Sequence, residues 1–467
     1  MSLLKGLRPA LVEILPLAIP LMISTGIFSL VLFADRTFLL WYDPPAMSAS
    51  MASGNLFWVL ACTPVGTASM SGAIIGQYLG KGDQAAIGRF LWQTVWFSLL
   101  TVPYFAILAL WAPKLFSSTG QPDGLIEMES TYFRWLMFGA VGCVLENALA
   151  GFFSAMGRTG VILWAALLTG IFNVGLDIVL IFGWGPIPAL GIFGAAMASA
   201  LAFWLHAGIF AWFLWTPETR QKFGLSAGRV WETSMFRRLL YFGGPSGLMY
   251  LIEAGAFAAI VLKIGSLGDL PLRATTMAIN FNMVAFIPLV GVSIAVSVLV
   301  GRHLTESGPL RAASTARAGL LIALIYSGLW ALAYHFAGRK LMRLYSLSGT
   351  NSTGGEASDD NVLYAMDLGE MLLGFVAIYI VFDALQITMA GALRGAGDTW
   401  FVMAASLSTT VIAISLGWIL DPRVPFSADS TDSLMHWWWV LTGWIVSLAL
   451  LMVGRYLSGR WKGIRMV

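Results

Sequence analysis

Twelve long runs of apolar residues, separated by short polar or charged segments, dominate the chain. An α-helix needs about 20 mostly apolar residues to cross the hydrocarbon core of a bilayer. The strands of a membrane β-barrel would show short alternating segments instead, and these runs do not alternate. The pattern therefore predicts twelve transmembrane helices. They are expected near residues 12–36, 48–75, 91–112, 132–154, 161–183, 190–215, 239–263, 274–300, 318–340, 363–392, 400–420 and 435–457.

The composition excludes a soluble enzyme. Of the 467 residues, 58% are hydrophobic and only 11% are charged, whereas a soluble domain carries about a quarter charged residues. The run that contains Pro16 and Pro20 is too long for a cleaved signal peptide and lacks a small-residue cleavage site after it, so we interpret it as the first span. Cys62 and Cys143 both lie in apolar runs, which indicates neither a disulfide framework nor a metal cluster.

The basic residues divide unevenly between the two sides of the predicted membrane protein. Eighteen of the 27 lysines and arginines fall on the side that holds both termini, and nine fall on the other. Lysine and arginine are enriched in cytoplasmic loops. The sequence therefore predicts a multi-pass plasma-membrane protein with both termini in the cytoplasm, and the basic excess is a topology signal with no implied nucleic-acid partner.

The two halves of the chain resemble each other. At an offset of 225 residues, Leu15 matches Leu240, Pro20 matches Pro245, Asn55 matches Asn280, Gly66 matches Gly291 and Gly76 matches Gly301. Further on the offset becomes 237, which aligns Glu146 with Asp383, and the polar stretch 346–361 is expected to be a longer loop that accounts for the change.

This duplication predicts an all-α polytopic membrane protein in which two six-helix bundles are related by a pseudo-two-fold axis along the membrane normal. We expect an N-terminal lobe over residues 1–216, a basic cytoplasmic linker over 217–238 and a C-terminal lobe over 239–467.

Five acidic residues lie inside predicted spans. A carboxylate in a membrane helix costs on the order of 2.5–3.5 kcal/mol on insertion scales, and such residues usually mark ion or proton pathways. None of the five has a basic residue three or four positions away in its span, so a bound cation or a proton is the natural counter-charge. These acids are Asp35, Glu146, Asp177, Glu253 and Asp383.

Polar neighbours strengthen two of these positions. Asn173 and Asp177 are four residues apart and share a helix face. Tyr379 and Asp383 have the same spacing, and Gln386 follows one turn later. Such oxygen-rich faces suit a hard cation such as Na⁺ and can also relay a proton. The alternative is that each acid is a neutral, hydrogen-bonded contact between helices.

The sequence leaves two possible roles for each of three further polar residues. Glu146 is either a supporting site residue or part of a structural network. Asn55 and Asn280 are either site residues or interhelical hydrogen-bond partners. The isolated histidines His206 and His335 are assigned no role.

Motifs for other chemistries are missing from the sequence. It contains no G-x-x-x-x-G-K-[ST], which argues against ATP-driven transport by this chain alone. It also contains no H-E-x-x-H and no G-x-S-x-G, which argues against an intramembrane hydrolase. We therefore expect no enzymatic activity and no cofactor.

Three segments resemble the multidrug and toxic compound extrusion (MATE) transporters, most closely the NorM-like branch. They are residues 382–399 (FDALQITMAGALRGAGDT), 76–83 (GQYLGKGD) and 277–282 (MAINFN), and the first is the most specific. The resemblance extends over nearly the whole chain. One departure is that the first half reads Gly157-Arg158-Thr159 where the second half reads Gly397-Asp398-Thr399.

The resemblance implies two six-helix lobes, a central cleft and export driven by an inward Na⁺ or H⁺ gradient. It implies a C-lobe cation site at Glu253 and Asp383 with Tyr379 beside them, and it favours Na⁺ there. It also implies an N-lobe site for a cation, a proton or the substrate, formed by Asp35, Asn173 and Asp177. Asn55, Asn280, Gln386 and Glu146 are the candidate supporting residues.

The sequence is interpreted as a secondary antiporter that exchanges Na⁺ or H⁺ for an organic, cationic and amphipathic compound. The coupling ion is transported rather than held as a cofactor. The expected partners are this small molecule and the lipid bilayer, and one chain is expected to suffice. A lipid-linked oligosaccharide flippase and an ion channel are the alternatives. The acidic membrane-embedded charges argue against the flippase, and stoichiometric exchange would distinguish an antiporter from a channel.

Overall fold

A computed structural model describes residues 7–117, 122–349, 359–422 and 431–467. In this part of the chain the structure is helical, with no β-strand, and twelve helical segments are long and apolar enough to cross a membrane. The twelve predicted spans are confirmed. The first six spans are formed by α2 (Leu7–Tyr42), α3 (Pro44–Ser69) with α4 (Ser71–Lys81), α5 (Gln84–Leu100) with α6 (Val102–Ser117), α7 (Asp123–Ala155), α8 (Thr159–Phe182) and α9 (Ile192–Leu214).

The second six spans follow a short connection that contains α10 (Pro217–Lys222) and the 3₁₀ turn η1 (Ala227–Arg229). The spans are α11 (Thr233–Gly265), α12 (Asp269–Glu306), α13 (Pro309–Gly349), α14 (Asp359–Ala396), α15 (Thr399–Ile419) and α16 (Asp432–Leu457), and the 3₁₀ turn η2 (Arg460–Gly463) comes after them. The polar stretch 346–361, predicted as a loop, is helical at both flanks, and its residues 350–358 lie outside the described residues.

Most helices extend beyond the apolar runs that predicted them. The 38 residues of α12 correspond to about 57 Å of helix, whereas the hydrocarbon core is about 30 Å thick. An α-helix forms its backbone hydrogen bonds internally, so it continues into the polar region without a penalty. Hydropathy therefore located each span and underestimated its length.

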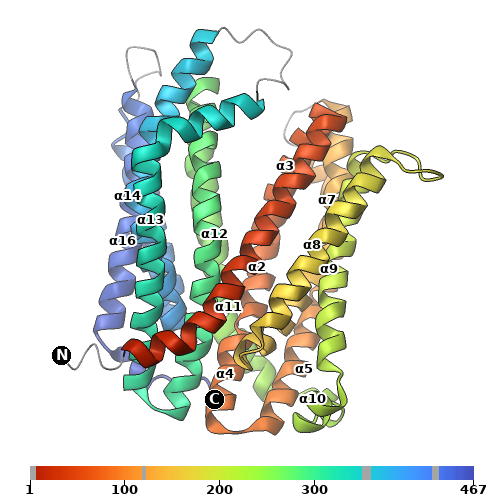
Figure 1. Cartoon of the computed structure of the whole chain (residues 1–467), viewed down its shortest axis with the longest axis vertical. Helices are drawn as coiled ribbons and strands as arrows, with labels where there is room; N and C mark the ends of the chain where they lie inside the picture. The colour runs from red at the N-terminus through yellow and green to blue at the C-terminus, as the bar shows by residue number, and fades with distance from the viewer. Residues whose placement is uncertain (1–6, 118–121, 350–358, 423–430) are drawn as a thin grey trace.

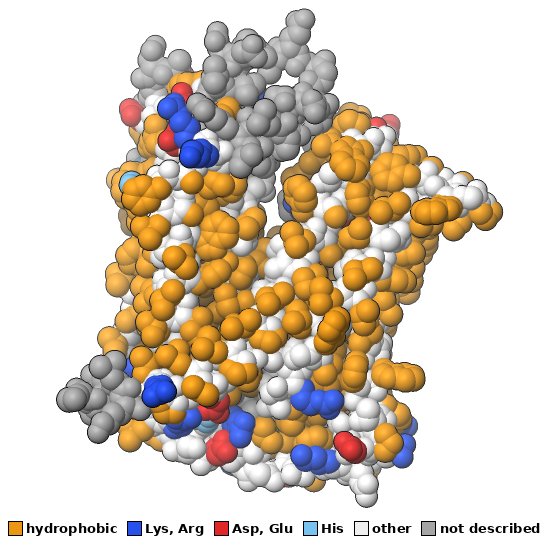
Figure 2. All heavy atoms as spheres, viewed as in Figure 1, with side chains coloured by type: hydrophobic (Ala, Val, Ile, Leu, Met, Phe, Trp, Pro, Cys, Tyr) orange, Lys and Arg blue, Asp and Glu red, His pale blue; other side chains and the backbone are white. Residues whose placement is uncertain are grey.

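The helices form two lobes, the N-lobe of α2–α9 and the C-lobe of α11–α16. Figure 1 shows the lobes meeting at the end of the molecule where both chain termini lie, which we call the terminus side, and diverging toward the other end. Across the boundary α12 packs against α2 and α4, and α11 packs against α3. Figure 2 shows a hollow between the lobes at the end opposite the termini. The predicted architecture of two six-helix bundles is confirmed.

Paired glycines form the contact between the lobes, and they obey the pseudo-two-fold symmetry. A Cβ built on Gly76 of α4 would lie 2.8 Å from the carbonyl oxygen of Val298 in α12. A Cβ built on Gly301 of α12 would lie 2.8 Å from the carbonyl oxygen of Ala73 in α4. The two contacts interchange at the offset of 225 residues. The spacing shared by the two halves of the chain therefore comes from two helices that cross at the axis with no room for side chains between their backbones.

A second pair of glycines extends the same symmetry outward. A Cβ on Gly66 of α3 would lie 2.8 Å from Cα of Gly247 in α11. A Cβ on Gly291 of α12 would lie 2.5 Å from the backbone nitrogen of Met22 in α2. These contacts also correspond at an offset of 225. The glycines matched in sequence are thus the points where the lobes touch.

The second offset of the repeat is corrected by the structure. Gly157 and Gly397 both have positive φ, at 71° and 99°, and each lies in the turn between two successive spans. This correspondence requires an offset of 240 instead of 237. In the uninterrupted helices before the turns, Glu146 therefore corresponds to Gln386 and not to Asp383.

Candidate functional site

Three helices of the C-lobe converge on the carboxylate of Glu253. Glu253 lies in α11, and its Oε1 accepts a hydrogen bond from Ser406 Oγ of α15 at 2.8 Å. The same oxygen accepts a second hydrogen bond from Gln386 Nε2 of α14 at 3.3 Å. Hydrogen bonds to an ionised carboxylate are stronger than neutral ones, so both donors hold this oxygen in a defined position.

Asp383 and Tyr379 lie on one face of α14, beside Glu253 of α11. Both side chains are buried, and Asp383 interacts electrostatically with Glu253 and with Tyr379. The Tyr379 hydroxyl has no hydrogen-bond partner among the described residues. A buried polar atom without a partner costs about 1–3 kcal/mol, so this hydroxyl is available to a ligand. Two carboxylates, a phenol and the Gln386 amide form what we call the C-lobe cluster.

A second pair of buried carboxylates lies in the N-lobe. Asp35 of α2 accepts a hydrogen bond at Oδ2 from the Tyr132 hydroxyl of α7, at 2.9 Å. Asp177 and Asn173 lie on one face of α8, and Asp177 interacts electrostatically with Asp35. All four side chains are at most 4% exposed. The structure therefore brings together the three N-lobe residues predicted from the sequence and adds Tyr132; we call these four the N-lobe cluster.

The N-lobe cluster has more acceptor oxygens than donors. Both carboxylate oxygens of Asp177, Oδ1 of Asn173 and Oδ1 of Asp35 have no hydrogen-bond partner in the described part of the chain. The hydroxyl oxygen of Thr169, one turn before Asn173, is in the same situation. Buried charge is stable only when it is paired or neutralised. Carboxylate and amide oxygens suit a hard cation, and neighbouring carboxylates can share a proton.

Glu146 pairs with a histidine of a neighbouring helix. Its Oε2 lies 3.0 Å from Nδ1 of His206, which belongs to α9. His206, to which the sequence assigned no role, also stacks on Phe210 at a centroid distance of 4.7 Å. This contact supports the structural interpretation of Glu146. Its supporting role at a site stays a prediction.

The two matched asparagines differ in their surroundings. Asn55 is exposed on α3, whereas Asn280 is half-buried on α12. The symmetry of the sequence therefore does not extend to their environments, and the roles predicted for them stay predictions.

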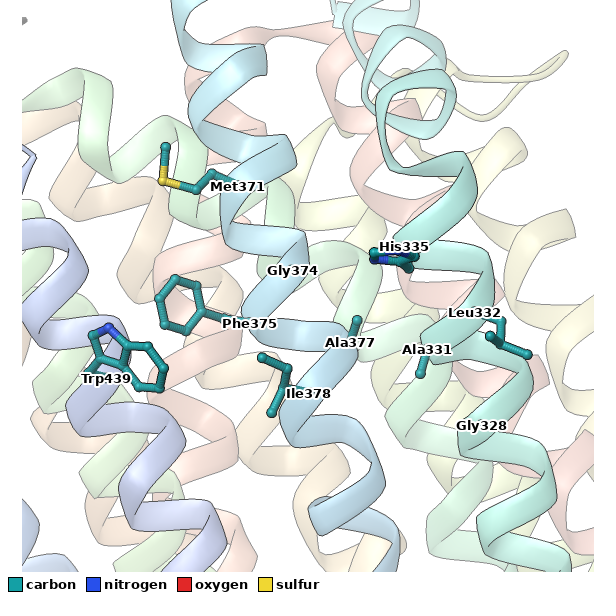
Figure 3. A pocket seen from close by; sticks show the side chains of 10 residues that line it. All are labelled: Gly328, Ala331, Leu332, His335, Met371, Gly374, Phe375, Ala377, Ile378 and Trp439. Atoms are coloured by element: carbon teal, nitrogen blue, oxygen red, sulfur yellow. The ribbon is translucent and has the colours of Figure 1, made fainter.

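A groove on the outside of the C-lobe, about 810 Å³ in volume, is separate from both clusters. Figure 3 shows it between α13, α14 and α16, with Met371, Phe375, His335 and Trp439 among the side chains that line it. Its lining is almost entirely apolar and includes none of the clustered carboxylates. Trp439 is 59% exposed, as expected of a surface that faces lipid.

The sequence model of the MatE family matches this chain over residues 20–179 and 245–419. The two matched stretches together cover most of the chain and correspond to the two lobes. The chain belongs to the MatE family. The resemblance noted in the sequence is thereby confirmed, and membership of this family of secondary transporters means that the protein is not an enzyme and needs no cofactor.

Relatives within the family are similar over almost their whole length. The multidrug resistance protein NorM of Burkholderia vietnamiensis is 27% identical over 443 residues, which cover 94% of this chain and 92% of the relative. The probable multidrug resistance protein NorM of Thermotoga maritima is 24% identical and covers 96% and 93%. The multidrug resistance protein PmpM of Pseudomonas aeruginosa is 27% identical and covers 91% and 89%.

Solved MATE structures share the fold. The crystal structure of the eukaryotic MATE transporter AtDTX14 aligns with a TM-score of 0.82 at 17% identity and covers 98% of this chain and 97% of that one. The crystal structure of MATE in the straight conformation aligns with a TM-score of 0.82 at 18% identity and covers 97% of both chains. The twelve-helix, two-lobe architecture is therefore that of MATE transporters.

Several residues in or next to the two clusters of this MatE-family protein could not be identified from the sequence. Tyr132 is 97 positions from Asp35, and Ser406 is 153 positions from Glu253. Serine and tyrosine are common in membrane helices, and neither residue stands in a motif. Arg394, counted as one of the basic residues that set the topology, has a side chain only 5% exposed inside the C-lobe. Burial is the signal that singles it out, and burial requires the fold.

Proposed function

We propose that this MatE-family protein is a cation-coupled secondary antiporter that exports organic, cationic and amphipathic compounds by alternating access. The observation that carries the proposal is the pair of carboxylates inside each lobe, with acceptor oxygens that lack hydrogen-bond partners in the N-lobe. Buried charges in a membrane protein mark ion pathways. The relatives' names, multidrug resistance protein NorM and PmpM, support the export of diverse small molecules.

The proposed orientation places the terminus side in the cytoplasm and the protein in the cytoplasmic (inner) membrane. The basic excess supports it, because eighteen of 27 lysines and arginines belong to the segments of that side. Figure 2 shows blue side chains gathered around this end of the molecule, with a smaller group at the other end of the C-lobe. The lobes are then in contact toward the cytoplasm and separated toward the outside.

Each cluster is built within a single lobe, which supports a functional monomer. The C-lobe cluster uses α11 and α14, with Ser406 of α15 donating to Glu253, and the N-lobe cluster uses α2, α7 and α8. No second copy of the chain is needed to complete either group. Transport by one chain therefore requires only that its two lobes move relative to each other.

In the proposed cycle, Na⁺ or H⁺ enters from outside and binds at the C-lobe cluster through Glu253 and Asp383, with Tyr379 beside them. The family resemblance favours Na⁺. A cation that binds more tightly to one conformation shifts the population toward it, and an organic cation that prefers the other conformation is released. The N-lobe cluster serves as a second cation or proton site or as the site of the organic cation.

The test is efflux of the fluorescent cation ethidium from proteoliposomes under an inward Na⁺ or H⁺ gradient. We expect Asp383→Asn to abolish gradient-driven transport. Asp367→Asn is the matched control, because Asp367 lies on the same helix but is 61% exposed, where it pairs with Arg339 at 3.2 Å. Transport that survives Asp383→Asn would overturn C-lobe coupling, and Asp177→Asn would then show whether the N-lobe carries it. Failure of wild type under both gradients would overturn the antiporter assignment.

A further inference from the structure

A buried arginine lies beneath the C-lobe cluster and has no part in the proposed cycle. Arg394 of α14 donates one hydrogen bond from Nη2 to Ser293 Oγ at 3.0 Å and another from Nη1 to the Tyr250 hydroxyl. Its guanidinium carbon lies 5.2 Å from the centroid of the Tyr250 ring. Its Nε is buried and has no hydrogen-bond partner among the described residues. A charged group held this tightly in a membrane helix is costly unless it compensates another charge.

The charge that Arg394 compensates is in the C-lobe cluster. Tyr250 precedes Glu253 by one turn of α11, so the arginine that binds Tyr250 lies one layer toward the terminus side. The guanidinium interacts electrostatically with Glu253. The two carboxylates of the cluster and Arg394 carry a net formal charge of −1 when all three are ionised. A single monovalent cation is then enough to neutralise the group.

Tyr250 also touches the opposite lobe. A Cβ built on Gly66 of α3 would lie 2.5 Å from Cδ2 of Tyr250. The tyrosine ring therefore packs directly on the backbone of the N-lobe, at one of the symmetric contacts between the lobes, while its hydroxyl binds Arg394. The Tyr250 side chain therefore connects Arg394, on the terminus side of the C-lobe cluster, with the contact between the lobes that must separate when they move.

The packing of the lobes does not itself require this pair. By the pseudo-two-fold relation, Tyr250 corresponds to Thr25 and Arg394 corresponds to Ser154. The Thr25 hydroxyl donates to backbone oxygens of its own helix, at 3.0 Å. At the equivalent position Gly291 contacts the backbone of Leu21 and Met22, so the arginine and the tyrosine are specific to the C-lobe.

We propose that Arg394 is the resident counter-charge of Glu253 in the C-lobe cluster, and that Tyr250 is the positioning residue that transmits its displacement to the contact with Gly66. The inference rests on the proposed function and adds the link between ion binding and lobe movement. While the cluster holds no cation, the carboxylate of Glu253 attracts the guanidinium. A bound cation cancels that attraction, so the guanidinium is held by its hydrogen bonds to Tyr250 and Ser293 alone, and the Tyr250 ring shifts against α3.

The first experiment compares Tyr250→Phe with Tyr104→Phe in ethidium-loaded proteoliposomes. Tyr104→Phe is the matched control, because its hydroxyl donates to the Leu60 carbonyl at 3.0 Å within the N-lobe, between α6 and α3. Loss of a hydrogen bond to a charged group corresponds to at least about a tenfold effect. We expect Tyr250→Phe to lower gradient-driven efflux by at least about that factor, while ethidium exchange without a gradient stays within about threefold. Tyr104→Phe should leave both unchanged.

The second experiment tests the charge of Arg394 through the concentration of the driving cation that gives half-maximal efflux. Arg394→Gln removes a competing positive charge, so this concentration should fall at least about tenfold. Arg394→Lys keeps the charge and should stay near wild type. A purely structural role predicts weaker cation use by both variants, which would overturn the proposal.

The outcomes separate this inference from the proposed function. If Asp383→Asn keeps gradient-driven efflux, C-lobe coupling itself fails. If Asp383→Asn loses it while Tyr250→Phe behaves like wild type, coupling stands and the transmission through Tyr250 is wrong. If Tyr250→Phe loses gradient-driven efflux and gradient-free exchange equally, the tyrosine is structural and the inference is overturned.

Discussion

The contact between the lobes on the terminus side includes an ionic cluster that can be weakened by one substitution. Glu13 of α2 belongs to the N-lobe, and its Oε1 lies 2.8 Å from Nε2 of His303 in α12. Its Oε2 accepts a hydrogen bond from Nη2 of Arg311 in α13 at 2.7 Å. The hydroxyl oxygen of Thr315 lies 2.8 Å from Nδ1, the other ring nitrogen of His303. All partners of Glu13 belong to the C-lobe, so this cluster exists only while the lobes are in contact.

The solvent exposure of Glu13 and Arg311 determines how much free energy their ionic contact contributes. Hydrogen bonds to charged groups contribute about 1.5–3 kcal/mol when shielded, and exposed ion pairs contribute about 0–1 kcal/mol. Glu13 and Arg311 are 28% and 31% exposed, between these limits. Glu13→Gln removes the charge and keeps the size of the side chain. We therefore expect it to destabilise the contact by about 1.5 kcal/mol, which raises the population of the separated state about tenfold.

The assay measures how often the contact opens. Ala73 lies in the interface and is 2% exposed, so a cysteine introduced there reacts with a maleimide only when the lobes separate. Cys62 and Cys143, the native cysteines, are replaced first. The modification rate of Ala73→Cys should rise about tenfold when Glu13→Gln is added, because the rate follows the population of the separated state.

Glu306→Gln provides the control for general charge effects at the terminus side. Glu306 pairs with Arg302 of its own helix at 2.9 Å, so its ion pair does not bridge the lobes. The Glu306→Gln substitution should leave the modification rate of the cysteine at position 73 unchanged. An unchanged rate with Glu13→Gln, or an equal increase with Glu306→Gln, would show that the Glu13 ion pairs do not hold the lobes together.

Three further variants test other parts of the structure. Gly76→Ala puts a Cβ 2.8 Å from a backbone oxygen of α12, so overpacking of about 1–3 kcal/mol should accelerate modification of the same interface cysteine; an unchanged rate would contradict the tight crossing. Asp398→Asn weakens a pair of hydrogen bonds with Arg455 at 2.6 and 3.1 Å, and thermal unfolding should show a loss of about 2–3 kcal/mol, with an unchanged midpoint as the contrary result. Tyr132→Phe removes the hydroxyl that donates to Asp35, which leaves that carboxylate oxygen to the cation. If the N-lobe binds the driving cation, the cation concentration for half-maximal efflux should fall at least about threefold. A rise in this concentration would contradict the prediction.

The carboxylates of both clusters were identified from sequence because a charge inside an apolar span is locally visible and energetically costly. The hydroxyl donors Tyr132 and Ser406, which bind Asp35 and Glu253, were not, because each lies on another helix, 97 and 153 residues away. Glu146 was selected by the same rule. It lies against His206 of α9, and its supporting role at a site stays a prediction.

The repeat shows a similar division. The offset of 225 residues was read from matched prolines, asparagines and glycines, and the structure explains the glycines Gly66, Gly76, Gly291 and Gly301 as contacts between the lobes. The offset of 237 for the later helices was wrong by three residues, although the sequence also pairs Gly157-Arg158-Thr159 with Gly397-Asp398-Thr399 at an offset of 240. The positive φ values of Gly157 and Gly397 identify the equivalent turns directly.

The class of the protein, the number of spans, the duplication and the acids that carry charge into the membrane could be predicted from the sequence, because hydropathy and spacing are local properties of the chain. Which faces of the helices meet, and so which residues surround each acid, depends on the tertiary packing. In a lipid bilayer the outer and inner faces of a helix are similarly apolar, so no stripe of hydrophobic residues indicates the packed face. The positions of Tyr132, Ser406 and Arg394 depend on that packing.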